Sequence, residues 1–222
     1  MDHTRHDQEP TSKGESFHTH ILYVSTIVLF IWSVEITELL LQTSFSHWGL
    51  KPRTAQGLLG IVTMPFLHGD FDHVWSNSFG LIALGLMMLQ FYRRVTLRVV
   101  IISTLCSGAL VWLFARPSYH IGASAVIYAL SGFLFISGLL RRDRASLGAL
   151  LIVSFLFGAS VWGVLPLQVG ISWEGHLFGA LTGIALAFIY RNVDLPPSEE
   201  ETEEPEQWLY NPYREDGGRH GW

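Results

Sequence analysis

The sequence predicts an all-α membrane protein, a bundle of six transmembrane helices with both termini on the cytoplasmic side. Apolar residues make up 49% of the chain and charged residues 15%, whereas soluble domains carry about 25% charged residues. Six apolar stretches are separated by charged and turn-forming residues, and each approaches the ~20 residues that a helix needs to cross a bilayer. Clusters of arginine recur in alternate loops, and this pattern sets the expected orientation.

The expected spans begin and end where the apolar runs do. They cover Thr19–Leu41, Val74–Tyr92, Val95–Ala115, Ser124–Leu140, Leu147–Pro166 and Glu174–Tyr190. The first run is longer than the apolar region of a signal peptide, and no Ala-x-Ala cleavage motif follows it. We therefore expect it to remain in the protein as a span.

The orientation follows from the loops that hold arginine, because cationic loops are retained on the cytoplasmic side. Three groups of cations fall on one side of the predicted bundle: Arg93, Arg94 and Arg98; Arg141, Arg142 and Arg144; and Arg191. Both termini then lie on that side. We expect a cytoplasmic N-terminal segment over residues 1–18, the membrane domain over 19–191, and an acidic, disordered tail over 192–222.

Polar residues gather just before the second span. His68, His73 and Asn77 lie within ten residues of one another, and the i, i+4 spacing of His73 and Asn77 puts both on one helix face. A single histidine here would be interpreted as a polar residue that caps a helix at the membrane interface. Two histidines and an asparagine together indicate a functional site.

The fourth span begins with small residues and a serine. Gly122 precedes Ser124 by two residues, and Tyr128 follows it one helical turn later. A serine at a helix start lies near free backbone N–H groups and the positive end of the helix dipole, which both favour a developing anion. Small residues in a membrane helix are also a common packing surface, so this segment alone does not identify a catalytic serine.

The sixth span begins with Gly175, His176 and Gly179. Glycines four residues apart form a smooth stripe against which another helix can pack closely. His176 borders the stripe, and an ionisable residue inside a membrane domain is a candidate for function.

The predicted topology brings these three clusters to the same end of the bundle. His176 is then a general base for the nucleophile Ser124, in a dyad without a carboxylate. The Ser124 N–H with the side chains of His73 and Asn77 would stabilise the oxyanion. Tyr128 lies on the same helix face as Ser124 and is expected to stack on the His176 ring.

The chain resembles the rhomboid family of intramembrane serine proteases from about Thr19 to Tyr190. The motifs are His68, His73 and Asn77 at their spacing, Gly122 and Ser124 followed by Tyr128, and Gly175-His176 with Gly179. Ala125 stands where many members have a second glycine. The resemblance implies a rhomboid-like six-helix bundle with a water-filled cavity that cleaves transmembrane protein substrates in membrane lipid. From the compact size and the lack of organelle targeting we expect a prokaryotic plasma membrane.

Other functions stay open at this point. One is an inactive rhomboid-like protein that binds membrane helices without cleaving them, which the presence of both Ser124 and His176 disfavours. Another is a metal-dependent hydrolase using His68, His73 and His176 with Asp70 or Asp72, but no His-Glu-x-x-His motif is present. A channel or transporter would be expected to carry paired charges at the bilayer centre, and such charges are scarce here. We expect no cofactor, no metal and no nucleic-acid partner, and the oligomeric state cannot be read from the sequence.

Overall fold

The structure is a computed structural model that describes residues 17–168 and 170–195. Within these ranges the elements are α1 (Phe17–Leu41), η1 (Ser46–Trp48), α2 (Ala55–Thr63), η2 (Met64–Phe66), α3 (Phe71–Phe91), α4 (Arg93–Phe114), α5 (Ser124–Arg141), α6 (Arg144–Phe157), η3 (Gly158–Val164) and α7 (Trp173–Ile189). The predicted tail from residue 196 onward and most of the predicted N-terminal segment, residues 1–16, lie outside the described residues.

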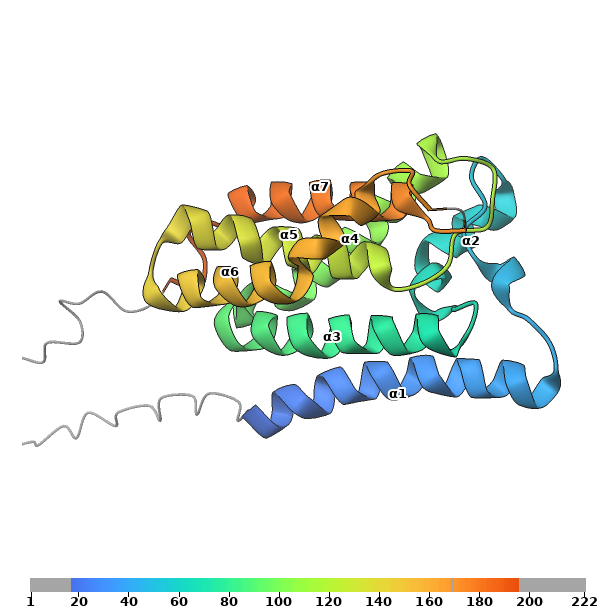
Figure 1. Cartoon of the computed structure of the whole chain (residues 1–222), viewed down its shortest axis with the longest axis horizontal. Helices are drawn as coiled ribbons and strands as arrows, with labels where there is room; N and C mark the ends of the chain where they lie inside the picture. The colour runs from blue at the N-terminus through green and yellow to red at the C-terminus, as the bar shows by residue number, and fades with distance from the viewer. Residues whose placement is uncertain (1–16, 169, 196–222) are drawn as a thin grey trace, which may run out of the picture.

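The prediction of an all-helical membrane protein is confirmed for the described part of the chain. Five helical segments there are long and apolar enough to cross a bilayer: α1, α3, α4, α5, and α6 continued through η3. The sixth predicted span is α7, an apolar helix of 17 residues. Figure 1 shows that α1 begins and α7 ends at the same end of the bundle.

The fifth predicted span, Leu147–Pro166, is not one continuous α-helix. The α-helix ends at Phe157, and the chain continues as the seven-residue 3-10 segment η3. In this tighter winding, the carbonyls of Ser160 and Gly163 each accept a hydrogen bond from a side chain of another helix. In a regular α-helix such carbonyls accept backbone N–H groups of the same helix. The change to 3-10 winding therefore makes them available as acceptors for side chains of other helices.

A short helix that the sequence analysis did not predict lies in the first connection. The side chain of Thr54 caps α2 by accepting the Gly57 N–H at 3.0 Å. Gly57 and Gly60 bring α2 against the backbone of Lys51 and Leu50, with no room for a Cβ. The connection is thus a packed element and not an open loop.

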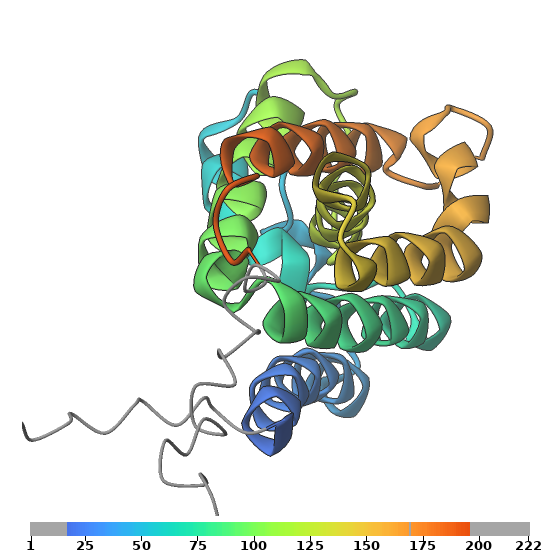
Figure 2. The same ribbon diagram turned by 90° about the vertical axis from the view of Figure 1, so that its left-hand side faces the viewer.

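Two glycines determine how closely α7 approaches α5. A Cβ at Gly179 would collide with the backbone of Ala125, and a Cβ at Gly183 would collide with the backbone of Ala129. The stripe inferred from the sequence is therefore a helix contact in which only glycine fits. Figure 2 shows α7 crossing directly beside α5. This contact sets the position of the side chains in the first turn of α7, which include His176.

The opposite end of α5 is held by an aromatic and cationic cluster. The Tyr92 ring packs edge-on against Phe133 with centroids 5.2 Å apart, and its hydroxyl donates to Ser146 Oγ at 3.0 Å. The Arg141 guanidinium lies 4.3 Å from the Tyr92 ring centroid and donates to the carbonyls of Tyr190 and Val193 at the end of α7. These contacts join the α3–α4 junction, α5, α6 and the chain just after α7, at the end of α5 opposite Ser124.

Candidate active site

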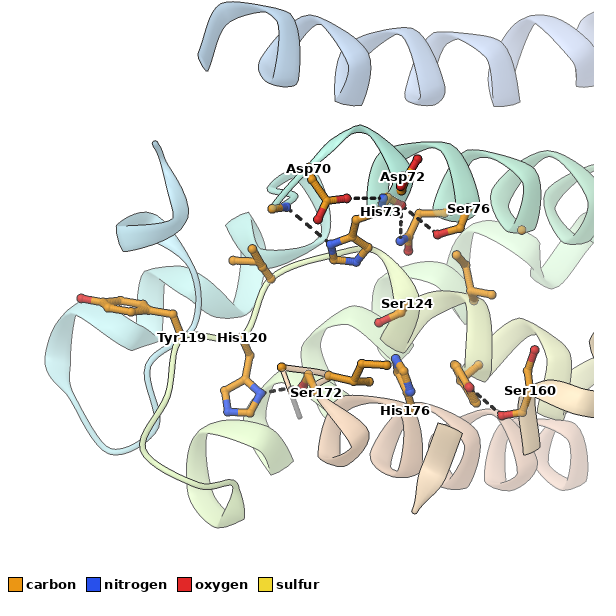
Figure 3. Close-up of a pocket in the computed structure, with 18 of the residues that line it drawn as sticks. Asp70, Asp72, His73, Ser76, Tyr119, His120, Ser124, Ser160, Ser172 and His176 are labelled. Atoms are coloured by element: carbon orange, nitrogen blue, oxygen red, sulfur yellow. Dashed lines mark hydrogen bonds between the residues drawn. The ribbon is translucent and has the colours of Figure 1, made fainter. Parts of the chain in front are cut away.

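A cavity of about 920 Å³ opens among the N-terminal ends of α3, α5 and α7. Its wall includes five of the residues singled out from the sequence: His73, Asn77, Ser124, Tyr128 and His176. Figure 3 shows Ser124 between His73 and His176. Three segments far apart in the chain therefore contribute polar side chains to one cavity.

Ser124 is the first residue of α5 and is partly buried in the cavity wall. The turn before it depends on Gly122, whose φ of +103° lies in a region that favours glycine. The Gly122 N–H donates to the Met64 carbonyl at 2.9 Å, which ties the turn to η2. Because the first N–H groups of a helix have no carbonyl partner within the helix, this turn offers donors beside the serine hydroxyl.

His176 is held in a single tautomer by η3. Its Nδ1 lies 2.9 Å from the Gly163 carbonyl, and a carbonyl only accepts hydrogen bonds, so Nδ1 carries the proton. Nε2 is then the unprotonated nitrogen, available as a base. The ring stacks on Tyr128 with centroids 4.2 Å apart and planes at 9°.

Tyr128 is itself fixed by the same 3-10 segment. Its hydroxyl donates to the Ser160 carbonyl at 2.6 Å. A Cβ on Gly163 would meet both the Tyr128 hydroxyl and His176 Nδ1. The His176 ring and the Tyr128 hydroxyl therefore pack directly against the backbone of Gly163. The stacking expected from the sequence is present.

Ser124 and His176 share the cavity without a direct hydrogen bond in this structure. Among residues 17–168 and 170–195, His176 bonds to Gly163, and no bond joins its ring to the serine hydroxyl. In enzymes without bound substrate, such catalytic bonds are often long and tighten only when substrate binds.

His73 presents its Nε2 side to the turn that precedes Ser124. Its Nδ1 accepts a long hydrogen bond, 3.5 Å, from the Gly69 N–H, which places the ring proton on Nε2. A Cβ on Gly122 would lie 2.6 Å from that Nε2. Asn77 donates from Nδ2 to the His73 carbonyl at 2.8 Å, and its buried Oδ1 has no protein partner among the described residues. Both side chains therefore lie beside the serine turn.

His68 lies behind His73 and does not reach the cavity wall. Its ring packs edge-on against the His73 ring, with centroids 4.9 Å apart, and it is 2% exposed. Burial, followed by repulsion from His73, lowers the pKa of His68 from 6.5 to about 4. We infer that it supports the orientation of His73.

A pH dependence of stability follows from this burial. Between pH 6.5 and 4 the unfolded chain binds a proton at His68 that the folded chain does not, so the free energy of unfolding falls as the pH drops through this window. The loss attributable to His68 is on the order of 3 kcal/mol. Thermal unfolding of the purified protein at pH 7 and pH 4.5 should show a smaller pH effect in His68→Gln than in the wild type; an equal effect would contradict the assignment.

A second polar cluster ties the loop before Ser124 to α7. Arg116 Nε pairs with the buried Glu174 carboxylate at 3.2 Å, and the same guanidinium donates to the Ile171 carbonyl. His120 Nδ1 lies 2.6 Å from Ser172 Oγ. These contacts fix the loop before Ser124 against the start of α7, which form the side of the cavity opposite α3.

The tautomer of His120 can be assigned from its partners. Nε2 lies 3.2 Å from the Arg116 carbonyl and must donate to it, so Nδ1 accepts the Ser172 hydroxyl proton. Burial lowers the pKa of His120, which keeps the ring neutral. No role for this cluster was predicted from the sequence, where its one visible sign is that polar residues occur in two predicted loops far apart in the chain.

The metal-hydrolase alternative finds no geometric support within residues 17–168 and 170–195. No three histidine, cysteine, aspartate or glutamate side chains there are arranged to hold an ion. His68 and His73 face each other edge to edge, and Asp70 caps α3 by accepting the His73 N–H at 2.8 Å.

Comparison with known proteins gives the family. The family model described as Rhomboid domain matches residues 55–193. A protein of Mycobacterium tuberculosis described as uncharacterized is 31% identical over 199 residues, covering 84% of this chain and 82% of its own length. Another such protein, from Mycobacterium leprae, is 28% identical over 176 residues, covering 75% and 69%.

A plant protein is also similar over part of the chain. The "RHOMBOID-like protein 6, mitochondrial" of Arabidopsis thaliana is 30% identical over 133 residues, which are 58% of this chain and 42% of that protein. The profile match extends from α2 to just beyond α7 and includes the whole cavity wall. The helical membrane fold, the residues at the cavity and these matches together show that the chain belongs to the rhomboid family.

Proposed function

We propose that this protein is an intramembrane serine endopeptidase that uses Ser124 as nucleophile and His176 as general base. The observation that carries the proposal is the hydrogen bond from His176 Nδ1 to the Gly163 carbonyl. It leaves Nε2 unprotonated in the same cavity as the Ser124 hydroxyl. A backbone carbonyl thus performs the orienting role that a carboxylate has in a triad.

The reaction divides into two steps at this dyad. Ser124 Oγ attacks the peptide carbonyl while His176 Nε2 takes its proton and then gives it to the leaving amine. Water next enters the cavity and attacks the acyl carbonyl while it loses a proton to Nε2. That proton then passes from Nε2 to the departing Ser124 Oγ, which frees the carboxylic acid product and restores the dyad. The Ser124 N–H and His73 Nε2–H are the proposed oxyanion donors, with Asn77 beside them; removing one such donor typically lowers the rate about 100- to 1000-fold.

The location of the site favours transmembrane proteins as substrates. Ser124 opens α5, one of the candidate spans, so the hydroxyl lies at the wet end of an apolar helix. A substrate helix in lipid keeps its backbone hydrogen-bonded, and it must unwind locally before the cavity can accept its peptide bond. We further propose a prokaryotic plasma membrane as the location of the protein, because the similar proteins of Mycobacterium tuberculosis and Mycobacterium leprae come from bacteria.

The test uses the full chain purified in detergent with a model single-span substrate. We expect cleavage within or beside the span, insensitivity to chelators, and covalent labelling of Ser124 by a fluorophosphonate, mapped by mass spectrometry. Inhibition by a chelator without serine labelling would support a metal hydrolase. Binding of the substrate with neither cleavage nor labelling would support an inactive helix-binding protein.

Tyr128 is proposed to position His176 and not to react. Tyr128→Phe removes the hydroxyl bond to Ser160 but keeps the stacked ring, so we expect a fall in kcat of about 2- to 10-fold. Tyr128→Ala also removes the stacking and should lower kcat further, with KM little changed. Equal kinetics for wild type and Tyr128→Ala would show that the ring does not position the base.

A further inference from the structure

Ser172 precedes helix α7 without using its hydroxyl as a helix cap. It occupies the N-cap position, but within the described part of the chain its side chain accepts no backbone N–H of the first turn. Serine is favoured at N-cap positions because its oxygen usually accepts such a bond. Here the hydroxyl instead donates to His120 Nδ1 at 2.6 Å (Figure 3). The side chain suited to capping α7 is therefore bonded to the loop that precedes Ser124.

His120 fixes this bond to two other parts of the protein. It is 1% exposed, and its Nε2 donates to the Arg116 carbonyl at 3.2 Å. Its backbone forms a β-bridge with Leu50 in the first connection, with N···O distances of 2.8 and 3.0 Å. The ring is thus held by its own loop and by the first connection, and its remaining nitrogen accepts the Ser172 proton.

Ser172 extends this restraint to His176 through the backbone. Its carbonyl accepts the His176 N–H at 3.2 Å, as the carbonyl of an N-cap residue does at the start of a helix. Gly175 leaves space for the hydroxyl, since a Cβ there would lie 3.0 Å from Ser172 Oγ. His120 lies four residues before Ser124. Two hydrogen bonds therefore lead from the loop of the proposed nucleophile to the backbone of the proposed base.

The start of α7 needs such a restraint because its close contact with α5 begins later. The first α7 glycine that touches the α5 backbone is Gly179, about one turn after His176. At Gly175 the nearest α5 atom is the Ala125 Cβ, 3.8 Å from an added Cβ, which is an ordinary contact. In the described part of the chain no hydrogen bond joins His176 to Ser124. Their separation therefore depends on how each segment is held.

We propose that His120 is a positioning residue for the dyad: through Ser172 it holds the first turn of α7 so that His176 Nε2 stays within reach of the Ser124 hydroxyl. This inference rests on the proposed function. His120 does not transfer protons itself, because both of its ring nitrogens are bonded within the protein. It acts on the fraction of molecules in which the base is aligned, and a misplacement of about 1 Å can lower a rate about 100-fold.

The test removes the bond between His120 and Ser172 from either side in the full chain. His120→Gln keeps a donor for the Arg116 carbonyl but has no acceptor at the position of Nδ1, and Ser172→Ala removes the hydroxyl. We expect each to lower kcat for a model single-span substrate about 10-fold, with KM changed by less than about 2-fold. The double variant should be no more than about 2-fold slower than the slower single one, because all three lose the same bond.

Conservative and control variants separate positioning from stability. Ser172→Thr keeps a hydroxyl and should restore kcat to within about 2-fold of the wild type, a rescue that loss of folded protein would not show. The Arg116–Glu174 pair still joins the two segments, and Ser172 is only partly buried, so Ser172→Ala should fold even if His120→Gln does not. The matched controls are His47→Gln and Ser154→Ala, at exposed positions outside the cavity wall, and both should cleave at the wild-type rate.

A second measurement is the rate at which a fluorophosphonate labels Ser124, which depends on the base but not on a substrate helix. It should fall about 10-fold in Ser172→Ala and stay unchanged in Ser154→Ala. The positioning role is overturned if an active wild type and Ser172→Ala have the same kcat, if KM rises while kcat is unchanged, or if the label is found on Ser172. A wild type that neither cleaves nor is labelled at Ser124 overturns the proposed function, and this role with it.

Discussion

Ser124→Ala is expected to lower the cleavage rate of a single-span substrate by about 10⁴-fold or more, as loss of the nucleophile does in serine proteases. The alanine removes only the hydroxyl, so helix α5 and the turn at Gly122 should be unaffected. His176→Ala should cost about as much, because a hydroxyl without its base is a weak nucleophile. The double variant should be no slower than either single one, since the two groups act as a unit.

The matched control is Ser160→Ala, which removes another hydroxyl from the same cavity wall. The carbonyl of Ser160 that holds Tyr128 is retained, so cleavage should stay close to the wild-type rate. The measurement is the initial rate of product formation on gels, with thermal unfolding as the check on folding. A folded Ser124→Ala protein that still cleaves at the wild-type rate would rule out the proposed dyad.

Gly179→Ala is expected to destabilise the protein and reduce its activity together. The added Cβ would occupy the same space as the Ala125 backbone, and a backbone atom cannot rotate away as a side chain can. Helices α5 and α7 must separate, at a cost of about 1–3 kcal/mol for an overpacked contact. Because His176 lies one turn earlier on α7, the separation also moves the proposed base away from Ser124.

Gly148→Ala provides the comparison for this substitution. Gly148 lies inside α6, and a Cβ there would meet no atom within 4 Å. Alanine at an open helical position should stabilise by about 0.5–1 kcal/mol. The unfolding midpoint should therefore fall in Gly179→Ala and rise slightly in Gly148→Ala; a similar midpoint for both would show that the α5–α7 contact is not close-packed.

The arrangement of apolar runs predicted most of the helices, because a membrane span needs a fixed length of apolar sequence. The predicted ends of the first four spans agree with α1, α3, α4 and α5 to within about three residues, as is usual for helix boundaries predicted from sequence. Helix α2 was not predicted because its nine residues, Ala55–Thr63, are fewer than the ~20 that a helix needs to cross a bilayer. The 3-10 break after Phe157 was missed because the apolar run continues through it.

The sequence alone determined which residue types meet at the candidate site, since motif spacing and alternating loops bring three helix starts to one end of the bundle. Only the tertiary structure decided how they are held: the Gly163 carbonyl that sets the His176 tautomer, the Ser160 carbonyl that fixes Tyr128, and the Arg116–Glu174 pair. Every residue has a backbone carbonyl, so no sequence pattern marks the one that will accept a bond from a distant helix. That choice depends on the close contact of α5 with α7 and on the local winding of η3.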